Sequence, residues 1–302
     1  MVLTEKMLQQ VLKGVRNPRS VGSGLFGKVR FLTHKLRSHE DESVSLWGGN
    51  KGIRDYVLFV TKAAADYRVF STFKSDPSYR EMLEHVTQEL GEKYLAIIKD
   101  QNPEFLDQFD QFKINDLVGT PITHFYSGIG MISPTTLRYV KVASDLRKYF
   151  GFDIGKKIVE IGVGYGGQLL VNDQIFKMKE YHLYDLEPVL SLVQRYLESH
   201  ILNCAYKTST LNQNSGDEHY DLAISNYAFS ELSSQLQRKY IDKILANSSK
   251  GYLTMNSGRK GSSFTFDKLS LDDLRRKLPP FEIFEEHPLT WQENYIIVWG
   301  HK

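Results

Sequence analysis

Three glycines, Gly162, Gly164 and Gly166, follow an apolar run that ends at Ile161. Glycine lets the backbone turn tightly and come close to a ligand. The helix expected after these glycines would offer free N–H groups and the positive end of its dipole. The loop is therefore predicted to bind a cofactor that carries a negatively charged or carboxylate group.

Two acidic residues help to distinguish between cofactors. Asp185 ends the second expected strand of this half, where a carboxylate can accept hydrogen bonds from both hydroxyls of a ribose. Glu160 stands just before the glycines, where it would not help a pyrophosphate but could serve an amino-acid ammonium through a water or the backbone. The glycines alone leave a dinucleotide open, because Gly162, Gly164 and Gly167 also match the G-x-G-x-x-G fingerprint. A structural strand-to-helix turn, with Asp185 capping the next helix, is a further alternative.

The two halves of the chain differ in pattern. Residues 1–150 are expected to be mainly helical, and the apolar stripe from Tyr79 to Leu90 follows the helical period. The glycine-rich segments 21–27 and 45–52 are expected to form turns or loops. Residues 151–302 alternate short apolar runs with longer amphipathic segments, which is typical of β-α-β units and a parallel sheet.

The expected elements can be placed from these patterns. A helix is expected to start at Ser133 and Pro134, because serine caps helices and proline suits their first position. The last two apolar runs are joined by residues without a helical pattern, so they are expected to pair as an antiparallel edge. The expected strands are 157–161, 181–184, 220–225, 251–255, 281–284 and 295–299, and the expected helices include 134–149, 188–200 and 233–245.

Composition excludes several classes of protein. The chain has 302 residues and a net charge of +2, which fits one large or two modest domains and argues against a nucleic-acid partner. The basic segment 28–37 is interpreted as a solvated or docking helix.

A single cysteine, Cys204, excludes an internal disulfide and a cysteine-based zinc site. The N-terminus lacks a signal-peptide pattern and no long apolar run occurs, so a cytoplasmic protein without a membrane span is expected.

Several motifs, in order, resemble those of a known class of enzymes. EIGVGYGGQ (160–168), Asp185-Leu186 and YDLAISN (220–226) resemble motifs I, II and IV of class I S-adenosylmethionine-dependent methyltransferases. Within that class, three further segments resemble the sugar O-methyltransferases of bacterial surface-polysaccharide biosynthesis. They are SPTTLRY (133–139), SNYAFSEL (225–232) and NYIIVWG (294–300).

The resemblance implies an α/β fold with a Rossmann-like, mostly parallel sheet whose last strand is antiparallel. Residues 1–150 would form a mainly helical cap, and residues 151–302 would form the catalytic domain that binds S-adenosylmethionine. The cofactor residues that it implies are Glu160, Gly162, Gly164, Gly166, Asp185, Leu186 and Asn226.

Methyl transfer to a sugar hydroxyl requires more than alignment of the reactants. The hydroxyl is a poor acid, so its oxygen needs a general base or a bound metal. Glu231 is predicted to be the base or a metal-linked carboxylate, with a helix N-terminal carboxylate as the alternative. Tyr227 and His124 are the other predicted catalytic residues, with core packing and a surface position as their alternatives. Magnesium held by carboxylates is left open, whereas the histidine spacing of a zinc site is lacking.

Arg138, Tyr126 and Asn294 are the predicted substrate residues. Arg138 suits a two-pronged contact with a phosphate or uronate, with a surface cation as its alternative. The predicted partner is a small molecule or nucleotide-linked sugar, and the helical half is expected to close over it and to carry homo-oligomer contacts. The alternative functions are methylation of a non-sugar molecule, NAD-dependent oxidation and cofactor binding without turnover.

Overall fold

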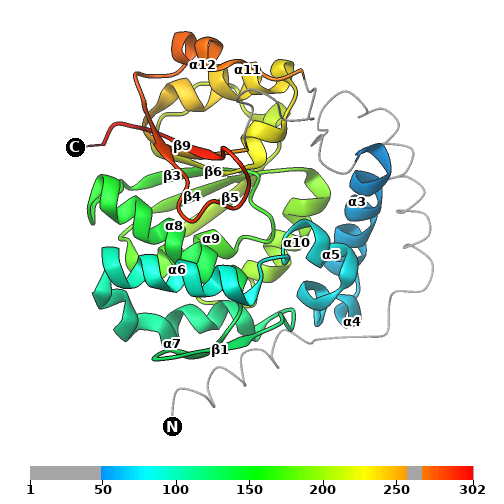
Figure 1. The fold of residues 1–302 in the computed structure, drawn as a ribbon. Coiled ribbons are helices and arrows are strands. Elements are labelled where there is room, and N and C mark those ends of the chain that lie inside the picture. Colours follow the sequence, from blue (N-terminus) through cyan, green and yellow to red (C-terminus); the bar gives the residue numbers. More distant parts are fainter. Residues whose placement is uncertain (1–48, 257–266, 302) are drawn as a thin grey trace, which may run out of the picture.

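Our computed structural model describes residues 49–256 and 267–301. These residues contain a seven-stranded mixed sheet (Figure 1). The strand order is β5-β4-β3-β6-β7-β9-β8. Strands β3 to β7 are parallel to one another, whereas β9 is antiparallel to both β7 and β8. The predicted fold class, a mostly parallel sheet with an antiparallel last strand, is therefore confirmed. The strands are β3 (Lys157–Ile161), β4 (Glu180–Tyr184), β5 (Ala205–Ser209), β6 (Tyr220–Asn226), β7 (Ser248–Met255), β8 (Glu282–Glu285) and β9 (Tyr295–Trp299).

The strand order reverses beside β3. The chain runs outward from β3 through β4 to β5, and then crosses to the other side of β3 with β6 and β7. In open α/β sheets, such a reversal leaves a crevice at the carboxyl ends of the two strands, and ligands bind there. The loop after β3 and the residues after β6 therefore frame the expected ligand position.

Helices cover both faces of the sheet, and the alternation of side chains in β3 shows how. Ile158 packs into an apolar cluster with residues of α8, α9 and α10, whereas Val159 and Ile161 pack with residues of α11 and α12. Successive side chains of a strand point to opposite faces, so a strand that is buried on both faces is mostly apolar. The helices are α8 (Pro134–Phe150), α9 (Gly167–Ile175), α10 (Glu187–Leu197), α11 (Ser234–Lys243) and α12 (Leu271–Lys277).

Helix α8 begins where the sequence predicts. Ser133 is its N-cap and its hydroxyl accepts a hydrogen bond from the backbone N–H of Thr135, at 3.2 Å. Pro134 occupies the first helical position, where its missing N–H costs nothing. Gly151, with φ of 75°, ends the helix and leads the chain toward β3.

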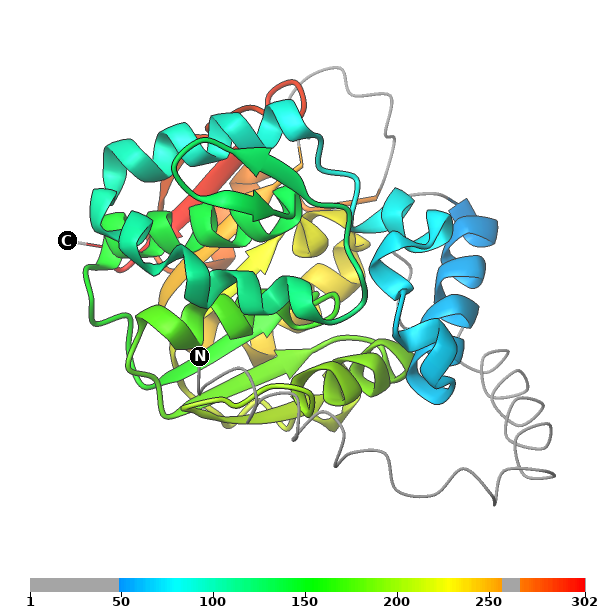
Figure 2. The same cartoon turned by 90° about the horizontal axis from the view of Figure 1, so that it is seen from below.

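The described N-terminal residues form helices that pack against the sheet's own helices. Helix α6 packs against α8, and α3 packs against α10, so that α3, α4 and α5 lie at one side of the molecule (Figure 2). One apolar cluster includes residues of both halves of the chain. These elements are α3 (Gly49–Ala65), α4 (Tyr67–Phe70), α5 (Pro77–Met82), α6 (Gln88–Gln101), α7 (Phe109–Phe112), β1 (His124–Tyr126) and β2 (Gly130–Ile132), with short 3-10 turns at 73–75, 103–108, 113–117, 211–213, 228–231 and 245–247.

Two expectations for this half are wrong. The stripe from Tyr79 to Leu90 is not one helix, because α5 ends at Met82 and α6 starts at Gln88. Thr87 caps α6 by accepting a hydrogen bond from the N–H of Leu90, and this cap favours a new start over a continuous helix. The segment 45–52 was expected to be a loop, but its described part, 49–52, is the first turn of α3.

Other expectations about the fold have mixed outcomes. The hairpin of β1 and β2, within the half expected to be helical, and the strand β5 were not predicted. The segments 21–27 and 28–37 lie outside the described residues. The antiparallel pairing of the last two strands is confirmed, although β9 lies between β7 and β8. In the described part of the chain, no helix has the combined length and apolar character needed to cross a membrane.

Candidate functional site

The loop between β3 and α9 has the backbone geometry that glycine allows. Gly162, Gly164 and Gly166 have φ values of 74°, 56° and 91°, in the left-handed region that L side chains rarely adopt. At Gly162 a Cβ atom would also lie 2.0 Å from the Cβ of Ala228. The loop therefore depends on glycine both for its turn and for its close approach to the residues after β6.

Asp185, directly after β4, is tied to this loop. The backbone N–H of Val163 donates to one carboxylate oxygen at 2.8 Å, and the N–H of Leu186 donates to the other at 2.7 Å. Burial raises the pKa of the Asp185 carboxyl to about 6, although hydrogen bonds from the backbone of Leu186, Val163 and Gly164 lower it. Each oxygen keeps acceptor capacity beyond these bonds, so the carboxylate can still receive hydroxyl donors.

Glu160 lies within β3 and is buried, with 2% of its surface exposed. The hydroxyl of Tyr181 donates to its carboxyl group at 2.8 Å. Burial raises the pKa of Glu160 to about 8, the bond from Tyr181 lowers it, and the Asp185 carboxylate raises it. Because its carboxyl group is enclosed, Glu160 can act on a ligand at the loop only through intervening groups.

The N-terminal half reaches the glycine loop through the link between α5 and α6. A Cβ atom on Gly164 would lie 3.2 Å from a methyl group of Leu83. The guanidinium of Arg138, on α8, donates to the carbonyl of Leu83 at 3.2 Å. Tyr56 and Tyr79 lie near Asp185, whose negative charge raises the pKa of both hydroxyls beyond the effect of burial. Residues of three helices thus gather over the loop.

The residues after β6 lie on the other side of the reversal in strand order. Asn226 ends the strand, and its side-chain oxygen accepts a bond from the Thr254 hydroxyl at 3.4 Å. Tyr227 follows with φ of 67°, which is strained for a residue with a side chain and costs about 1–3 kcal/mol. Its backbone N–H donates to the carbonyl of Thr254 at 2.9 Å. The surrounding bonds hold Tyr227 in this conformation, which sets the direction of its ring.

The hydroxyl of Tyr227 donates to the carboxylate of Glu286, in the loop between β8 and β9. Glu286 is 3% exposed, and its second oxygen accepts from the backbone and hydroxyl of Thr290, at 3.0 and 2.8 Å. The amide of Asn294 donates to the Thr290 hydroxyl at 3.0 Å. We call Tyr227, Glu286, Thr290 and Asn294 the Tyr227 cluster.

Two further groups border the Tyr227 cluster. Burial raises the pKa of Tyr94, on α6. The positive charge of Arg138 lowers this pKa and the negative charge of Glu286 raises it, which indicates that the Tyr94 hydroxyl lies near both charges. Burial likewise raises the pKa of Tyr227, and the Glu286 carboxylate raises it further. Tyr227 therefore remains a hydrogen-bond donor at neutral pH. The structure brings Arg138, Tyr227 and Asn294 together from three of the predicted segments.

Sequence reasoning missed Glu286 and Thr290. They lie in a loop without a regular pattern, and Glu286 is separated from Tyr227 by 59 positions in the chain. The pairing of β8 and β9 brings this loop to the carboxyl end of β6. A signal in the sequence would have been the concentration of polar residues in the long connection between two apolar strands.

The other predicted catalytic and substrate residues are not members of the Tyr227 cluster, although Glu231 lies close to Tyr227 in the chain. Glu231 ends the 3-10 turn after β6, where the amide of Asn256 donates to it at 2.7 Å. His124, on β1, lines a cavity beside the start of α8. Tyr126 packs against α6 and donates to the carbonyl of Gln88 at 3.3 Å. Within the described residues, no hydrogen bond or ring contact joins His124 or Tyr126 to the glycine loop or to the Tyr227 cluster.

The described residues offer no candidate metal centre. Across residues 49–256 and 267–301, no group of three or more His, Cys, Asp or Glu side chains is placed to hold a metal ion. Bound magnesium therefore has no support from the described part of the chain.

No family model matches the chain, and no curated protein matches it. Its fold is similar to that of solved methyltransferases. The methyltransferase domain of bacterial CtHen1-CN is 13% identical, with 53% of this chain and 96% of that chain covered and a TM-score of 0.39. CalS10, an amino pentose methyltransferase from Micromonospora echinaspora with bound SAM, is 11% identical, with 53% and 89% covered and a TM-score of 0.40. Magnesium protoporphyrin IX methyltransferase from Synechocystis PCC 6803, also with bound SAM, is 11% identical, with 73% and 95% covered and a TM-score of 0.40. At these values, the assignment of a function depends on the geometry of the site itself.

Proposed function

We propose that this protein is a methyltransferase that uses S-adenosylmethionine to methylate a hydroxyl group of a sugar or nucleotide-linked sugar. The observation that carries the proposal is the bond between the Val163 N–H and Asp185, which ties the glycine loop to a carboxylate at the reversal of the strand order. A carboxylate in this position suits the hydroxyls of a ribose. The motifs at 160–168, 185–186 and 220–226 support the same cofactor. The segments 133–139, 225–232 and 294–300 support a sugar as the acceptor.

The residues at the loop suit a nucleoside with an amino-acid tail. Asp185 would accept the ribose hydroxyls, because both its oxygens keep acceptor capacity after their backbone bonds. Gly162 and Gly164 present bare backbone, and the N-terminus of α9 would face the carboxylate of the tail. Leu186 and Asn226 would border the nucleoside from the ends of β4 and β6. S-adenosylmethionine, when bound, supplies an electrophilic methyl group.

The Tyr227 cluster is suited to the acceptor. A hydroxyl must lose its proton as its oxygen gains a methyl group, and a general base assists this loss. We assign the base to Glu286 acting through Tyr227: the acceptor proton passes to the Tyr227 oxygen as the Tyr227 proton passes to Glu286. Arg138 would hold a phosphate or carboxylate of the acceptor. Glu231, the residue predicted first, stays a rival for the same role.

Calorimetric titration with S-adenosylhomocysteine tests the cofactor, and a radiolabelled methyl-donor assay over nucleotide sugars tests the acceptor. We expect saturable binding of S-adenosylhomocysteine and methyl transfer to at least one sugar, with and without a chelator. Absence of binding, or binding of NAD instead, would overturn the proposal. Transfer only to molecules without sugar would retain the methyltransferase and reject the sugar acceptor.

A further inference from the structure

Helix α3 of the N-terminal half packs against α10, the helix that follows Asp185 (Figure 1). The guanidinium of Arg195, near the end of α10, donates to the carbonyls of Ala63 and Ala64 at 3.1 and 2.7 Å. These carbonyls belong to the last turn of α3, where carbonyl groups lack partners within the helix. Because the ends of the two packed helices lie together, the earlier turns of α3 lie toward the start of α10, beside Asp185.

Tyr56 stands in one of these earlier turns, and its side chain is half-buried. Its ring stacks on that of Tyr79, on α5, with the centroids 6.0 Å apart. The Tyr79 ring lies 6.4 Å from the ring of Tyr165, which belongs to the glycine loop. Burial raises the pKa of Tyr56, and the negative charge of Asp185 raises it further. The Tyr56 hydroxyl is therefore protonated at neutral pH and lies near this carboxylate.

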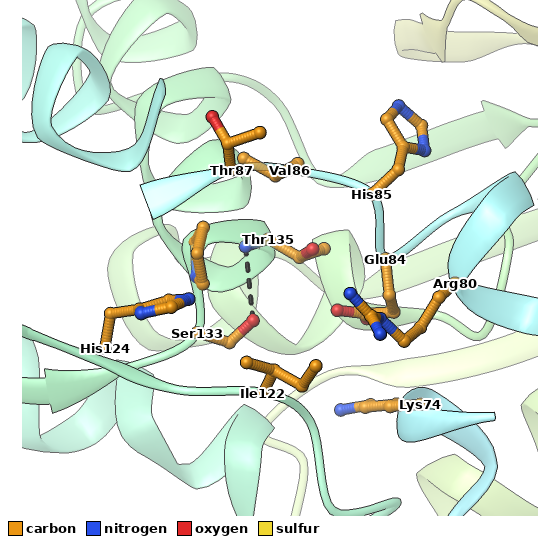
Figure 3. Close-up of a pocket in the computed structure, with 11 residues that line it drawn as sticks. Lys74, Arg80, Glu84, His85, Val86, Thr87, Ile122, His124, Ser133 and Thr135 are labelled. Atoms are coloured by element: carbon orange, nitrogen blue, oxygen red, sulfur yellow. Dashed lines mark hydrogen bonds between the residues drawn. The ribbon is translucent and has the colours of Figure 1, made fainter. Parts of the chain in front are cut away.

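Contacts at the end of α5 hold the Tyr79 ring, on which Tyr56 stacks. Glu84 follows this helix and lines the cavity beside the start of α8, together with Lys74 (Figure 3). Burial raises the pKa of the Glu84 carboxyl group, whereas the charge of Lys74 and the hydroxyl of Thr135 lower it. Thr135 belongs to the first turn of α8, so the end of α5 is tied to the helices of the sheet. The position of Tyr56 is thus fixed through both α3 and α5.

Tyr56 and Asp185 are near each other but have different hydrogen-bond partners. Among the described residues, the Tyr56 hydroxyl has no partner, and Asp185 accepts from backbone N–H groups. The Tyr56 hydroxyl is not one of the buried polar atoms that lack a partner, so it has surface that a ligand can contact. A carboxylate only accepts, whereas a protonated tyrosine can donate. A hydroxyl group does both, so one ligand hydroxyl can bridge the two side chains.

We propose that Tyr56 completes the cofactor site by donating a hydrogen bond to a ribose hydroxyl whose own hydrogen is accepted by Asp185. This inference rests on the proposed function, because it requires a nucleoside at the glycine loop. A ribose suits the two side chains, since either of its neighbouring hydroxyls can donate to the carboxylate while its oxygen accepts from the tyrosine. The N-terminal helices would then contribute directly to cofactor binding.

Titration calorimetry on the full chain tests the proposal. The ligands are S-adenosylhomocysteine and its 2′-deoxy and 3′-deoxy forms. We expect Tyr56→Phe to weaken the binding of S-adenosylhomocysteine about three- to tenfold, which is the size of one hydrogen bond. For one of the two deoxy forms, the same substitution should change the affinity by less than about twofold, because the hydroxyl that makes the bond is missing.

Two substitutions of the same kind are the matched controls. Tyr67→Phe changes a tyrosine of α4 that is 61% exposed, and it should leave the affinity unchanged. Tyr79→Phe removes a hydroxyl near Asp185 that is fully buried and cannot touch a ligand, so it should also leave the affinity unchanged. If Tyr56→Phe lowers thermal stability, the deoxy forms still decide. A disturbed fold would weaken the binding of all three ligands alike, whereas loss of one bond would spare the form that lacks the hydroxyl.

Three results would overturn the inference: unchanged affinity in Tyr56→Phe, an equal loss for all three ligands, and an equal loss in Tyr79→Phe. Failure of the proposed function would look different, because the unaltered chain would then not bind S-adenosylhomocysteine, and the inference would fall with it. If the unaltered chain binds this ligand and Asp185→Asn weakens the binding while Tyr56→Phe does not, the proposed function stands and the inference alone is wrong.

Discussion

The glycine loop and the Tyr227 cluster lie at the carboxyl ends of two neighbouring strands, β3 and β6, but the chain builds them differently. The loop is formed by consecutive residues from Gly162 to Gly166, and one carboxylate, Asp185, completes it from the neighbouring strand. The Tyr227 cluster joins Tyr227, which directly follows β6, to residues of the loop before β9. The two partners of its central hydrogen bond, Tyr227 and Glu286, are 59 positions apart in the chain. The first site depends on backbone conformation, and the second depends on side chains.

This difference suggests how the two sites can change. Replacement of a loop glycine alters the backbone itself, so the effect should extend to every ligand of the loop. Replacement of a side chain in the Tyr227 cluster should alter the chemistry but leave the cofactor in place. The predictions that follow test this separation.

The largest effect is expected for Glu286→Gln. The substitution keeps the shape of the side chain but removes its capacity to take a proton, so kcat should fall about 10²–10⁴-fold, with unchanged affinity for S-adenosylhomocysteine. Steady-state kinetics and calorimetry measure the two quantities. Glu285→Gln, at the neighbouring exposed position, is the matched control and should retain activity. If Glu231→Gln instead gives the larger loss of kcat, the base is Glu231 and the assignment to Glu286 is wrong.

The next effect is expected for Gly162→Ala. Its new Cβ would meet the Cβ of Ala228 at 2.0 Å, and its φ of 74° would strain an alanine. Overpacking and strain together cost about 2–4 kcal/mol, so affinity for S-adenosylhomocysteine should fall roughly 100-fold.

Two further variants sharpen this prediction. Gly128→Ala has a similar φ of 90° but no atom within 4 Å of the new Cβ, so it measures strain without a clash and should leave cofactor binding intact. Ala228→Gly, added to Gly162→Ala, should restore part of the affinity. Equal loss in Gly128→Ala and Gly162→Ala would refute the close-approach argument.

A smaller effect is expected for Asp185→Asn. The amide keeps the size of the side chain but loses its charge and one acceptor, so affinity for S-adenosylhomocysteine should fall by roughly a factor of ten. Calorimetry at pH 7.5 measures the change. Glu187→Gln, an exposed substitution in the same segment, provides the comparison and should change the affinity less. An unchanged affinity in Asp185→Asn would exclude this carboxylate from the ribose contact.

The smallest effect is the dependence of binding on pH. The pKa of Asp185 is raised to about 6, so the carboxylate gains a proton as the pH falls through 6 and loses acceptor capacity. The dissociation constant of S-adenosylhomocysteine should therefore rise as the pH is lowered, by at most tenfold from pH 6 to pH 5. In Asp185→Asn this rise should disappear. A rise of equal size in the variant would assign the titration to another group.

Local patterns were sufficient for much of the fold. The strands β3, β6, β7 and β9 are largely buried on both faces and each contains a short, mostly apolar run, so they could be recognised from the sequence. In contrast, β5 (Ala205–Ser209) lies at the edge of the sheet and three of its five residues, Lys207, Thr208 and Ser209, are polar, so no apolar run marks it. A strand at an edge has one neighbour and partly exposed side chains, so its sequence carries a weaker signal.

The apolar periodicity from Tyr79 to Leu90 predicted one continuous helix, which is wrong because contacts outside the segment decide its structure. The stripe of apolar residues is present, but it combines two helices with the link 83–87. Leu83 packs against the glycine loop, and its carbonyl accepts from Arg138. These contacts involve residues more than 50 positions away, and a window of neighbouring residues does not contain them.

The sequence by itself determined the glycine loop, the aspartate that follows β4 and the mostly parallel sheet, because each depends on backbone conformation or burial within a short segment. Only the tertiary structure decided that Glu286 meets Tyr227 and that Lys74 and Glu84 line one cavity. Such contacts depend on the order of the strands and on how the N-terminal helices pack. Neither the strand order nor the packing of these helices can be predicted from any single stretch of residues.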